Sequence, residues 1–345
     1  MLKNKIAIVI LNWNGKKYLE KFIPTLIKYS KHPEVEIVVA DNASTDVSKE
    51  FLKENYPGVH LIVLDKNYGF AEGYNRALSN INTDYYILLN SDVEVTGDWF
   101  LPVIEFMEKD EQIAVCMPKL KSYSEKEYFE YAGAAGGFID ELGFPFCRGR
   151  LFNTIEKDHG QYDQISEIFW ATGACTFIKS KIFHEVGGFD KDFFAHMEEI
   201  DLCWRIKVAG YKVFYFPYSI VYHVGGGTLP QGNPFKTFLN YRNNLFLLYK
   251  NLPSKKLLPI LFARLILDII SGFYSISTKK YNDLYIILKA HYHFFLSIPS
   301  LKKKRKNIQK IKKVNSVSCI YRGSIVKSYF INQIRIFSNI QNKII

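Results

Sequence analysis

The sequence predicts an α/β protein with an open, mostly parallel sheet, followed by a helical and basic C-terminal extension. Apolar runs of strand length recur through the first half of the 345 residues, and stretches with helical spacing lie between them. Charge is also divided sharply, since residues 1–229 have a net charge of −8 and residues 230–345 a net charge of +19. We therefore expect two parts, 1–229 and 230–345, of which the second has an anionic partner.

Five apolar runs define the expected strands. Most are continuous rather than alternating, which is typical of strands that helices cover on both faces. Residues 17–29 and 46–54 have the spacing of amphipathic helices and lie between the runs. The runs are at residues 6–11, 35–40, 59–64, 85–89 and 113–117.

The N-terminus and the cysteines indicate a cytoplasmic location. The first apolar run ends at residue 11 and is too short for the core of a secretory signal or for a membrane span. The five cysteines include no C-x-x-C pair, which favours a reducing compartment and argues against a cysteine metal site.

A polar segment follows each of the first four strands. Ligands of an open parallel sheet bind outside the carboxyl ends of its strands, so these segments are the expected site. The chain has no G-x-G-x-x-G after the first strand and no P-loop motif, which disfavours dinucleotide dehydrogenases and P-loop NTPases. Carboxylates, amides and small residues instead suit sugar hydroxyls and a metal-bridged diphosphate. The segments are NWNG at 12–15, DNASTD at 41–46, DKNYGFAEGYN at 65–75 and NSDVEV at 90–95.

Eight motifs follow one another along about residues 5–228. They are VILNWNG at 9–15, VVADNASTD at 38–46, NYGFAEGYNRA at 67–77, LLNSDV at 88–93, TGAC at 172–175, GGFD at 187–190, MEEIDLCWR at 197–205 and HVGGG at 223–227. In these motifs the chain resembles the family 2 glycosyltransferases with the GT-A fold, especially the bacterial rhamnosyltransferase-like branch. The resemblance implies a metal-dependent, inverting enzyme that transfers a sugar from a nucleoside-diphosphate sugar to a glycan or lipid-linked acceptor in cell-surface polysaccharide assembly. It also implies a donor half at about 1–117 and an acceptor half at about 118–229.

A divalent cation, Mn²⁺ or Mg²⁺, is the expected cofactor because it stabilises negative charge on a leaving diphosphate. Asp92 is the first expected ligand, although Asn-Ser-Asp is also common turn sequence. By resemblance His223 completes the site, although a histidine at a strand end is more often structural. Asn90 stands where many relatives have a first aspartate, which leaves Asp92 as the single acidic anchor.

The expected nucleotide-sugar residues lie at or just after strand ends. Trp13 offers a flat face to a base, and Asp41 by resemblance binds the base or ribose; a core position for Trp13 and a helix cap for Asp41 are the alternatives. Residues 67–75 by resemblance line the ribose and diphosphate, and turn chemistry explains them equally well. The full set is Leu11, Trp13, Asp41, Asn67, Gly69, Asn75, Ser91 and Asp92.

Three carboxylates are candidates for the general base that removes the acceptor proton: Glu198, Glu199 and Asp201. On a helix, Glu198 and Asp201 lie about 60° apart, whereas Glu199 lies about 160° from Asp201. Asp201 and Arg205 also form an i, i+4 pair, which gives Asp201 a structural alternative. Relatives place the base at the second acid of a Glu-Asp pair, and this position is Glu199 here.

Acceptor recognition is expected from the insertion at 118–170 and from the residues that follow it. Trp170, Thr172 and Gly173 are the candidates. Packing explains the insertion and Trp170 equally well.

The C-terminal part combines two apolar helices with a lysine cluster. Residues 257–277 and 281–298 are apolar, but Arg264 and Asp268 near the centre of the first would each cost about 2.5–3.5 kcal/mol inside a bilayer. With the cluster at 302–306, the helices suit the anionic inner face of the cell membrane, where we expect a peripheral protein.

Other interpretations of this part stay open. The helices are also compatible with packing on the catalytic part, with a solvated basic face. An alternative function for the whole protein is that of a binding module. Such a module would resemble a glycosyltransferase, would be catalytically inactive and would be recruited to membranes by this part. Nucleic acid is not an expected partner, because no recognised motif accompanies the charge.

Overall fold

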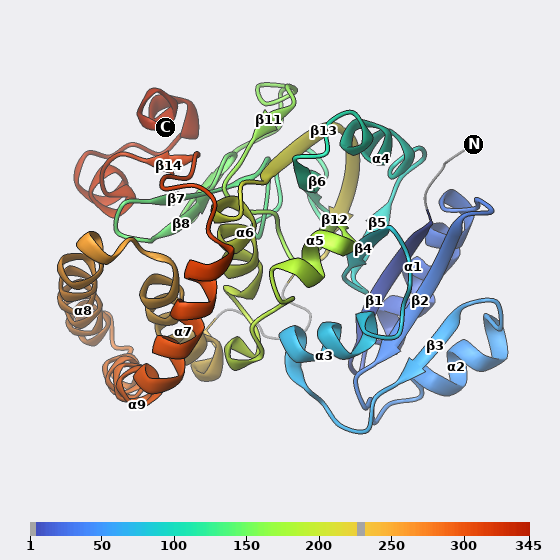
Figure 1. Cartoon of the computed structure of the whole chain (residues 1–345), viewed down its shortest axis with the longest axis horizontal. Helices are drawn as coiled ribbons and strands as arrows, with labels where there is room; N and C mark the ends of the chain where they lie inside the picture. The colour runs from blue at the N-terminus through green and yellow to red at the C-terminus, as the bar shows by residue number, and fades with distance from the viewer. Residues whose placement is uncertain (1–4, 226–231) are drawn as a thin grey trace.

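A mixed sheet of nine strands is the centre of the computed structural model, which describes residues 5–225 and 232–345 (Figure 1). The strands are β1 (Ile6–Asn12), β2 (Val35–Asp41), β3 (His60–Val63), β4 (Tyr85–Leu89), β5 (Val93–Val95), β6 (Ile113–Ser122), β11 (Ser166–Glu167), β12 (Cys175–Lys179) and β13 (Lys212–His223). Their order is β11-β13-β6-β12-β4-β1-β2-β3, and β5 pairs with β13. The group β3, β2, β1 and β4 is parallel, as are β6 and β13, whereas β12 runs antiparallel between the two groups.

The five predicted strands are confirmed as β1, β2, β3, β4 and β6, and most of their residues are buried because helices cover the sheet. In the parallel register, Asn12 at the end of β1 lies beside Asp41 at the end of β2. The polar segments after these strands therefore meet at one edge of the sheet, as the sequence predicts.

Six α-helices precede residue 226 in the described chain. The predicted helices at 17–29 and 46–54 form as α1 and α2, and α1 buries Leu19, Phe22, Ile23 and Leu26 on one face. In α6 every residue except Glu199 is buried, so α6 is a core helix. The helices are α1 (Lys16–Tyr29), α2 (Ser48–Asn55), α3 (Gly69–Leu78), α4 (Leu101–Glu108), α5 (Ser180–Glu185) and α6 (Glu198–Val208).

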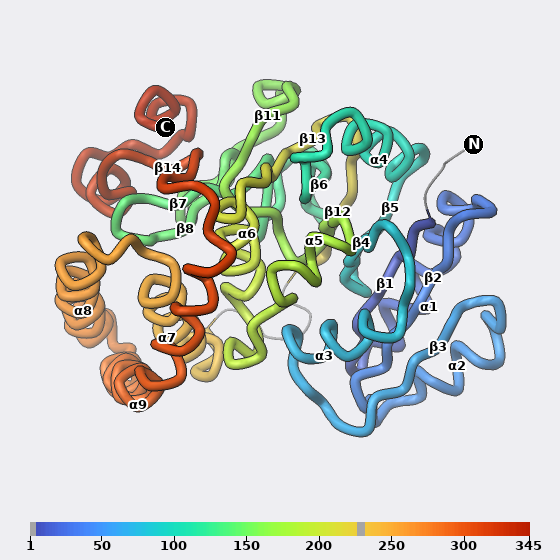
Figure 2. The backbone as a smooth tube through the Cα atoms, viewed as in Figure 1, coloured from blue at the N-terminus to red at the C-terminus, as the bar shows by residue number. Residues whose placement is uncertain are grey.

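Three further helices form most of the C-terminal part. They are α7 (Pro234–Asn251), α8 (Ser254–Ser277) and α9 (Asn282–Ile311), so the two predicted apolar helices are present and the second continues through the lysine cluster. α7 packs against α6 and against both α8 and α9, which lie on its outer side (Figure 2). Among the described residues, α8 alone is long and apolar enough to cross a membrane, judged by length and composition.

A second sheet joins the insertion to the C-terminus. Its strands are β7 (Gly137–Asp140), β8 (Pro145–Cys147), β9 (Arg150–Leu151), β10 (Thr154–Ile155) and β14 (Ile320–Tyr321), in the order β10-β9-β8-β7-β14. β14 pairs with β7 in parallel, and the carboxylate of Asp140 accepts a hydrogen bond from the backbone N–H of Ile325 at 2.9 Å. The α-helices of the extension thus end at residue 311. Its last segment adds strand β14 to this sheet and also contains three short helical turns, at 327–331, 337–339 and 341–343.

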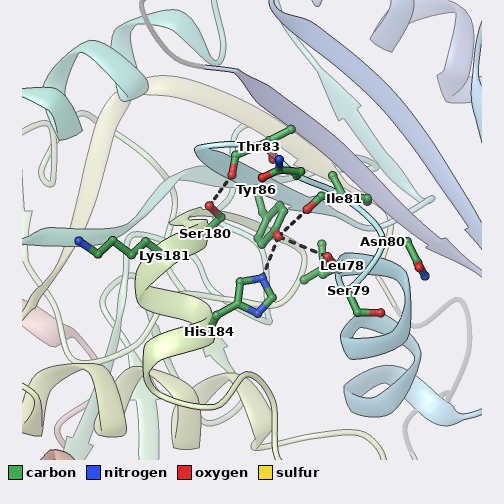
Figure 3. Close-up of a pocket in the computed structure, with 10 residues that line it drawn as sticks. Leu78, Ser79, Asn80, Ile81, Thr83, Tyr86, Ser180, Lys181 and His184 are labelled. Carbon is green, nitrogen blue, oxygen red and sulfur yellow. Dashed lines mark hydrogen bonds between the residues drawn. The ribbon is translucent and has the colours of Figure 1, made fainter.

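A hollow of about 350 Å³ lies beside the start of β4, between the end of α3 and the start of α5 (Figure 3). The hydroxyl of Tyr86 lies 2.9 Å from Nε2 of His184 and donates to the carbonyl of Ile81, also at 2.9 Å. This is the amino end of β4, whereas Asp92 lies beyond its carboxyl end. The hollow is therefore at the opposite edge of the sheet from the expected site.

The C-terminal segment should contribute strongly to stability through Phe337. This buried ring has its centroid 5.0 Å from that of Phe138 and 6.3 Å from that of Phe146. We expect Phe337→Ala to lower the free energy of unfolding by about 3–5 kcal/mol, measured by urea denaturation. Phe330→Ala in the same segment is the control and should cost much less, since Phe330 is largely exposed. Equal losses would contradict packing of this segment on the second sheet.

Candidate active site

Asp92, His223 and Glu130 form a buried row at the carboxyl edge of the sheet. Pairing of β5 with β13 sets Val93 opposite His223 and so brings Asp92 to the histidine. Nε2 of His223 lies 3.2 Å from Oδ1 of Asp92, and its Nδ1 lies 3.3 Å from Oε1 of Glu130. Asp92 and His223 are predicted from the sequence, but Glu130 is not. Pairing of residues 120 and 130 brings Glu130 into position.

The row carries charge at neutral pH. Burial disfavours the charged imidazole, but the carboxylates of Glu130 and Asp92 outweigh burial and raise the pKa of His223 to about 10. Burial likewise opposes ionisation of Asp92, but hydrogen bonding and attraction from His223 hold its pKa below the usual range. The two carboxylates thus favour the protonated imidazole, which must lose the proton on Nε2 before that nitrogen can bind a metal ion.

The chemistry of Asp92 and His223 suits a divalent cation only in part. Among residues 5–225 and 232–345, no group of three or more His, Cys, Asp or Glu side chains is arranged to hold a metal ion. One carboxylate oxygen and one imidazole nitrogen fit Mn²⁺ when a diphosphate and water supply the other ligands. Glu130 contacts the imidazole on the side opposite Asp92. Carboxylates in this position commonly orient a metal-binding histidine.

The end of β1 presents Trp13 and holds Asp41 inside. Trp13 is 43% exposed and is therefore no core residue. Asp41 is fully buried, where its Oδ1 accepts a hydrogen bond from Nδ2 of Asn12 at 3.2 Å and its Oδ2 one from the backbone N–H of Ser44 at 2.9 Å. Trp13 is thus accessible to a ligand, whereas Asp41 shapes the loop beneath.

Leu11 and Ser91 flank this loop, and both are partly buried. A Cβ on Gly73 would lie 2.9 Å from Cδ2 of Leu11, so Leu11 packs closely on α3. A Cβ on Gly15 would lie 3.3 Å from Oγ of Ser91, which places Ser91 beside the segment after β1.

The segment at 67–75 fastens α3 to residues 189–194. Gly69 has a φ of 72°, and a Cβ there would lie 2.5 Å from the ring of Phe194. The carbonyl of Phe194 accepts hydrogen bonds from the first N–H groups of α3, and Asn75 bonds in both directions with the backbone of Phe189 at 2.8 and 2.9 Å. Asn67 accepts a hydrogen bond from the backbone N–H of Gly69 at 2.8 Å. The contacts of Asn67, Gly69 and Asn75 in this structure are thus structural.

Glu198 and Glu199 begin α6 after a strained approach. His196 and Met197 have φ values of 68° and 73°, in the left-handed region that side chains disfavour. Oε2 of each glutamate is buried with no hydrogen-bond partner among the described residues. Burial raises the pKa of Glu199 to about 7, and burial with repulsion from Glu199 raises that of Glu198 well above its usual range. Such carboxyl groups are suited to exchanging a proton near neutral pH.

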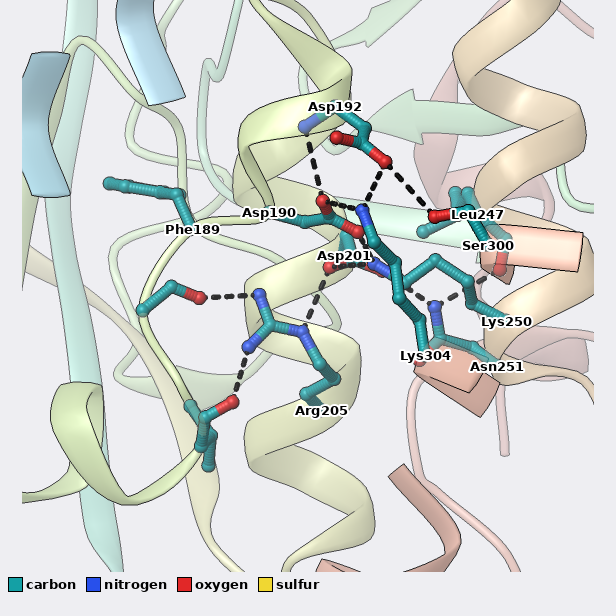
Figure 4. A network of polar contacts seen from close by, with 12 residues as sticks. Phe189, Asp190, Asp192, Asp201, Arg205, Leu247, Lys250, Asn251, Ser300 and Lys304 are labelled. Atoms are coloured by element: carbon teal, nitrogen blue, oxygen red, sulfur yellow. Dashed lines mark hydrogen bonds and ion pairs between the residues drawn. The ribbon is translucent and has the colours of Figure 1, made fainter. Parts of the chain in front are cut away.

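Asp201 is part of a buried ion-pair cluster instead (Figure 4). It accepts hydrogen bonds from Nε of Arg205, Nζ of Lys250 and Nδ2 of Asn251, each at 2.8 Å. Lys250 also pairs with Asp190 at 2.5 Å. Both oxygens of Asp201 are engaged, so its structural alternative is supported and Glu198 and Glu199 stay as candidates for the base.

Lys304 of α9 extends the cluster to a third helix. It pairs with Asp190 and Asp192, and Lys250 and Lys304 together outweigh burial and hold the pKa of Asp190 well below its usual range. Asn243 of α7 also donates to the backbone carbonyl of His196 at 2.8 Å and to those of two neighbouring residues. Helices after residue 229 thus hold the segment that leads into α6.

The proposed acceptor residues are mostly packed. Trp170 is 5% exposed, its Nε1 donates to the carbonyl of Phe138 at 2.9 Å, and Gly137 lies directly against its ring. Thr172 is buried and donates to the carbonyl of Ala132. Gly173 is partly buried, and a Cβ there would lie 3.1 Å from the ring of Phe70. Packing is therefore the role that the structure shows for Trp170.

Of the motif at 223–227, Gly226 and Gly227 lie outside the described residues.

Comparison with known proteins agrees with this architecture. Residues 7–187 match the family model described as Glycosyl transferase family 2. The chain is 24% identical over 233 residues to N-acetylglucosaminyl-diphospho-decaprenol L-rhamnosyltransferase of Mycobacterium tuberculosis (63% of this chain, 75% of the relative). It is 25% identical over 219 residues to Rhamnosyltransferase WbbL of Escherichia coli (61% of this chain, 80% of the relative).

Solved structures share the fold at low sequence identity. The structure of S. aureus TarS 1-349 in complex with UDP-GlcNAc superposes with a TM-score of 0.56 and 14% identity, covering 89% of this chain and 90% of that chain. The mannosyltransferase PcManGT from Pyrobaculum calidifontis in complex with GDP-Man and Mn²⁺ has a TM-score of 0.53 and 12% identity, covering 90% and 86%. These likenesses extend past residue 229 and so include the C-terminal helices.

The ion-pair cluster should be essential for stability. We expect Lys250→Met to lower the free energy of unfolding by about 3–5 kcal/mol, because it leaves the buried carboxylates of Asp190 and Asp201 without their shared cation. Lys303→Met on α9 is the control and should change it by less than about 0.5 kcal/mol, since Lys303 is exposed. Denaturant unfolding of both variants measures this, and indistinguishable midpoints would show that the cluster is dispensable.

Proposed function

The chain belongs to glycosyl transferase family 2, and from this premise we propose a metal-dependent enzyme that inverts the anomeric centre of its donor. The donor is a nucleoside-diphosphate hexose or deoxyhexose, and the acceptor is a hydroxyl of a glycan or lipid-linked saccharide in cell-surface polysaccharide assembly. One observation supports this most strongly. Glu199, the least buried residue of α6, has an unpartnered carboxylate oxygen and a pKa near 7.

The proposed reaction is a single displacement. The acceptor oxygen attacks the anomeric carbon as the bond to the diphosphate oxygen breaks, and the acceptor proton moves to Glu199. Burial, with the charges of both Glu130 and Glu199, raises the pKa of the Cys147 thiol, which supports a proposed base near the row that ends at Asp92. Trp13 is proposed to stack on the base of the nucleotide.

A divalent cation, when bound by Asp92 and His223, neutralises charge on the leaving diphosphate. The carboxylate of Glu130, 3.3 Å from Nδ1, would orient the imidazole with Nε2 toward Asp92. PcManGT is a structural neighbour solved with Mn²⁺, which supports the choice of metal.

We also propose that the acceptor is lipid-linked and that the enzyme acts at the cytoplasmic face of a membrane. The mycobacterial relative is named for an acceptor that joins a saccharide to decaprenol through a diphosphate. A catalytically inactive binding module, the rival interpretation, gives no reason for two unpartnered glutamates at the start of a core helix. Hydrolysis of a nucleotide sugar by the purified chain would exclude that rival.

Metal and donor binding should depend on Asp92. We expect Asp92→Ala to weaken Mn²⁺-dependent binding of a nucleoside diphosphate at least about tenfold, and Glu130→Gln to weaken it about 10–100-fold through loss of histidine orientation. Glu125→Ala is the control, because its exposed side chain has no role in the row. Calorimetric titration with Mn²⁺ or with a chelator measures the effect. The proposal fails if Asp92→Ala binds like the wild type, or if the chelator changes nothing.

Turnover should depend on Glu199 and on pH. We expect Glu199→Gln to lower turnover by about 10²–10⁴-fold with little change in donor affinity, since a base acts on the acceptor proton. A base must be deprotonated, so the wild-type rate should rise with pH through an apparent pKa of about 7. Glu198→Gln is the matched variant. If Glu198→Gln or Asp201→Asn is far more damaging than Glu199→Gln, the base has been assigned to the wrong carboxylate.

A further inference from the structure

Arg264 and Asp268 form a polar stripe on α8 that faces the protein, not the solvent. Arg264 donates to the carbonyl of Leu142 at 3.1 Å, and its guanidinium lies 3.6 Å from the centre of the Phe144 ring. Asp268 lies 3.4 Å from Arg264 and 3.3 Å from Nε2 of His291 on α9. The charged groups of α8 are therefore buried and paired, and its apolar side is directed outward.

The outer side of α8 and α9 is a largely apolar face, which also contains the exposed Lys289 of α9. The members named below are four and eleven residues apart along α8 and seven and four residues apart along α9, as on one side of each helix, and each is exposed to 60% or more. Soluble proteins rarely leave so many large apolar side chains in water on one surface. The principal members of this lipid face are Leu258, Phe262 and Phe273 on α8 and Tyr285, Tyr292 and Leu296 on α9.

Exposed lysines border the lipid face at both ends. Arg305 donates to Oγ of Ser254 at 3.0 Å, so the late part of α9 lies beside the start of α8. Residues 254–311 contain only two acidic residues, Asp268, which is buried, and Asp283, which is partly buried at the start of α9. The exposed lysines are Lys255, Lys256, Lys302, Lys303 and Lys306 at one end and Lys279 and Lys280 at the other.

The lysine cluster expected to act as one basic patch is divided in the structure. Lys304 pairs with Asp190 and Asp192, and Arg305 donates to the carbonyl of Tyr249 at 2.8 Å. Lys304 thus holds α9 on the catalytic part, whereas Arg305 holds α9 on α7. Lys302, Lys303 and Lys306 stay exposed and are the ones free to meet an anionic surface.

We infer that the lipid face lies flat on an anionic bilayer, with its apolar side chains at the boundary of headgroups and acyl chains and its lysines at the phosphates. Spanning by α8 would pull Arg264 and Asp268 from their partners into lipid, which the bilayer disfavours. A second copy of the chain on this face would bring lysine clusters of the same sign together. The exposed apolar side chains and the surrounding lysines therefore favour binding to a membrane surface over a membrane-spanning α8 and over a dimer.

The inference also links the membrane to the reaction. α7 packs between the lipid face and α6, and its Asn243 and Lys250 hold the segment and helix that carry Glu199. A lipid-linked acceptor held at this face would thus meet a base that the same helices position. This link rests on the proposed function, whereas binding to lipid does not.

The test is co-sedimentation of the full chain with vesicles of phosphatidylcholine alone or mixed equally with phosphatidylglycerol. We expect binding to the anionic vesicles that weakens with salt but persists. Phe262→Gln with Phe273→Gln should lower affinity about tenfold or more for both vesicles. Gln at Lys302, Lys303 and Lys306 should lower it about fivefold per lysine for the anionic vesicles alone, at low salt.

The matched control is Tyr218→Gln with Ile331→Gln, which removes two exposed apolar side chains outside the lipid face and should bind like the wild type. The inference is overturned if the full chain ignores anionic vesicles at low salt, or if the Phe262 and Phe273 changes abolish only a dimer. Nucleotide-sugar hydrolysis is measured in parallel without lipid. A chain that hydrolyses donor but ignores vesicles refutes the inference alone, and one that binds vesicles but no donor refutes the proposed function alone.

Discussion

The sharing of Lys250 between Asp190 and Asp201 is the interaction on which the site depends. Two buried carboxylates would repel each other without a cation, and the cation comes from α7, far along the chain. Buried ion pairs add little net stability over apolar packing, yet breaking one leaves an uncompensated charge, so they fix geometry strictly. Here the ion pairs fix the position of α6 relative to α7 and α9. Because His196 and Met197 are strained, such an anchor is needed to hold Glu199 in place.

Much of the fold could be predicted because its signals are local. Continuous apolar runs predicted the five strands, and polar segments after them predicted the functional edge. The i, i+4 spacing of Asp201 and Arg205 allowed the structural role that the ion-pair cluster supports. The polar stripe at Arg264 and Asp268 was visible too, but periodicity alone does not say which side of a helix faces the protein.

The missed features depend on contacts between distant parts of the chain. Glu130 reaches His223 across 93 positions of sequence only because of strand register, and nothing in its neighbourhood marks it. Lys250 and Lys304 look like ordinary surface lysines until α7 and α9 pack on the catalytic part. Asp41 and Trp170, predicted from their motifs as ligand-binding residues, are buried and bonded to their own neighbours, and their ligand-binding roles stay predictions.

The account's central claim is that the carboxyl edge of the sheet binds a nucleotide sugar together with a divalent cation. The most direct measurement is thermal unfolding of the full chain against a panel of nucleoside-diphosphate sugars with Mn²⁺, Mg²⁺ or chelator. A true donor at 100 times its Kd should stabilise the chain by about 2.7 kcal/mol, and only in the presence of a metal ion. If no nucleotide sugar raises the unfolding temperature with either metal, or if the chelator leaves the shift unchanged, the claim is contradicted.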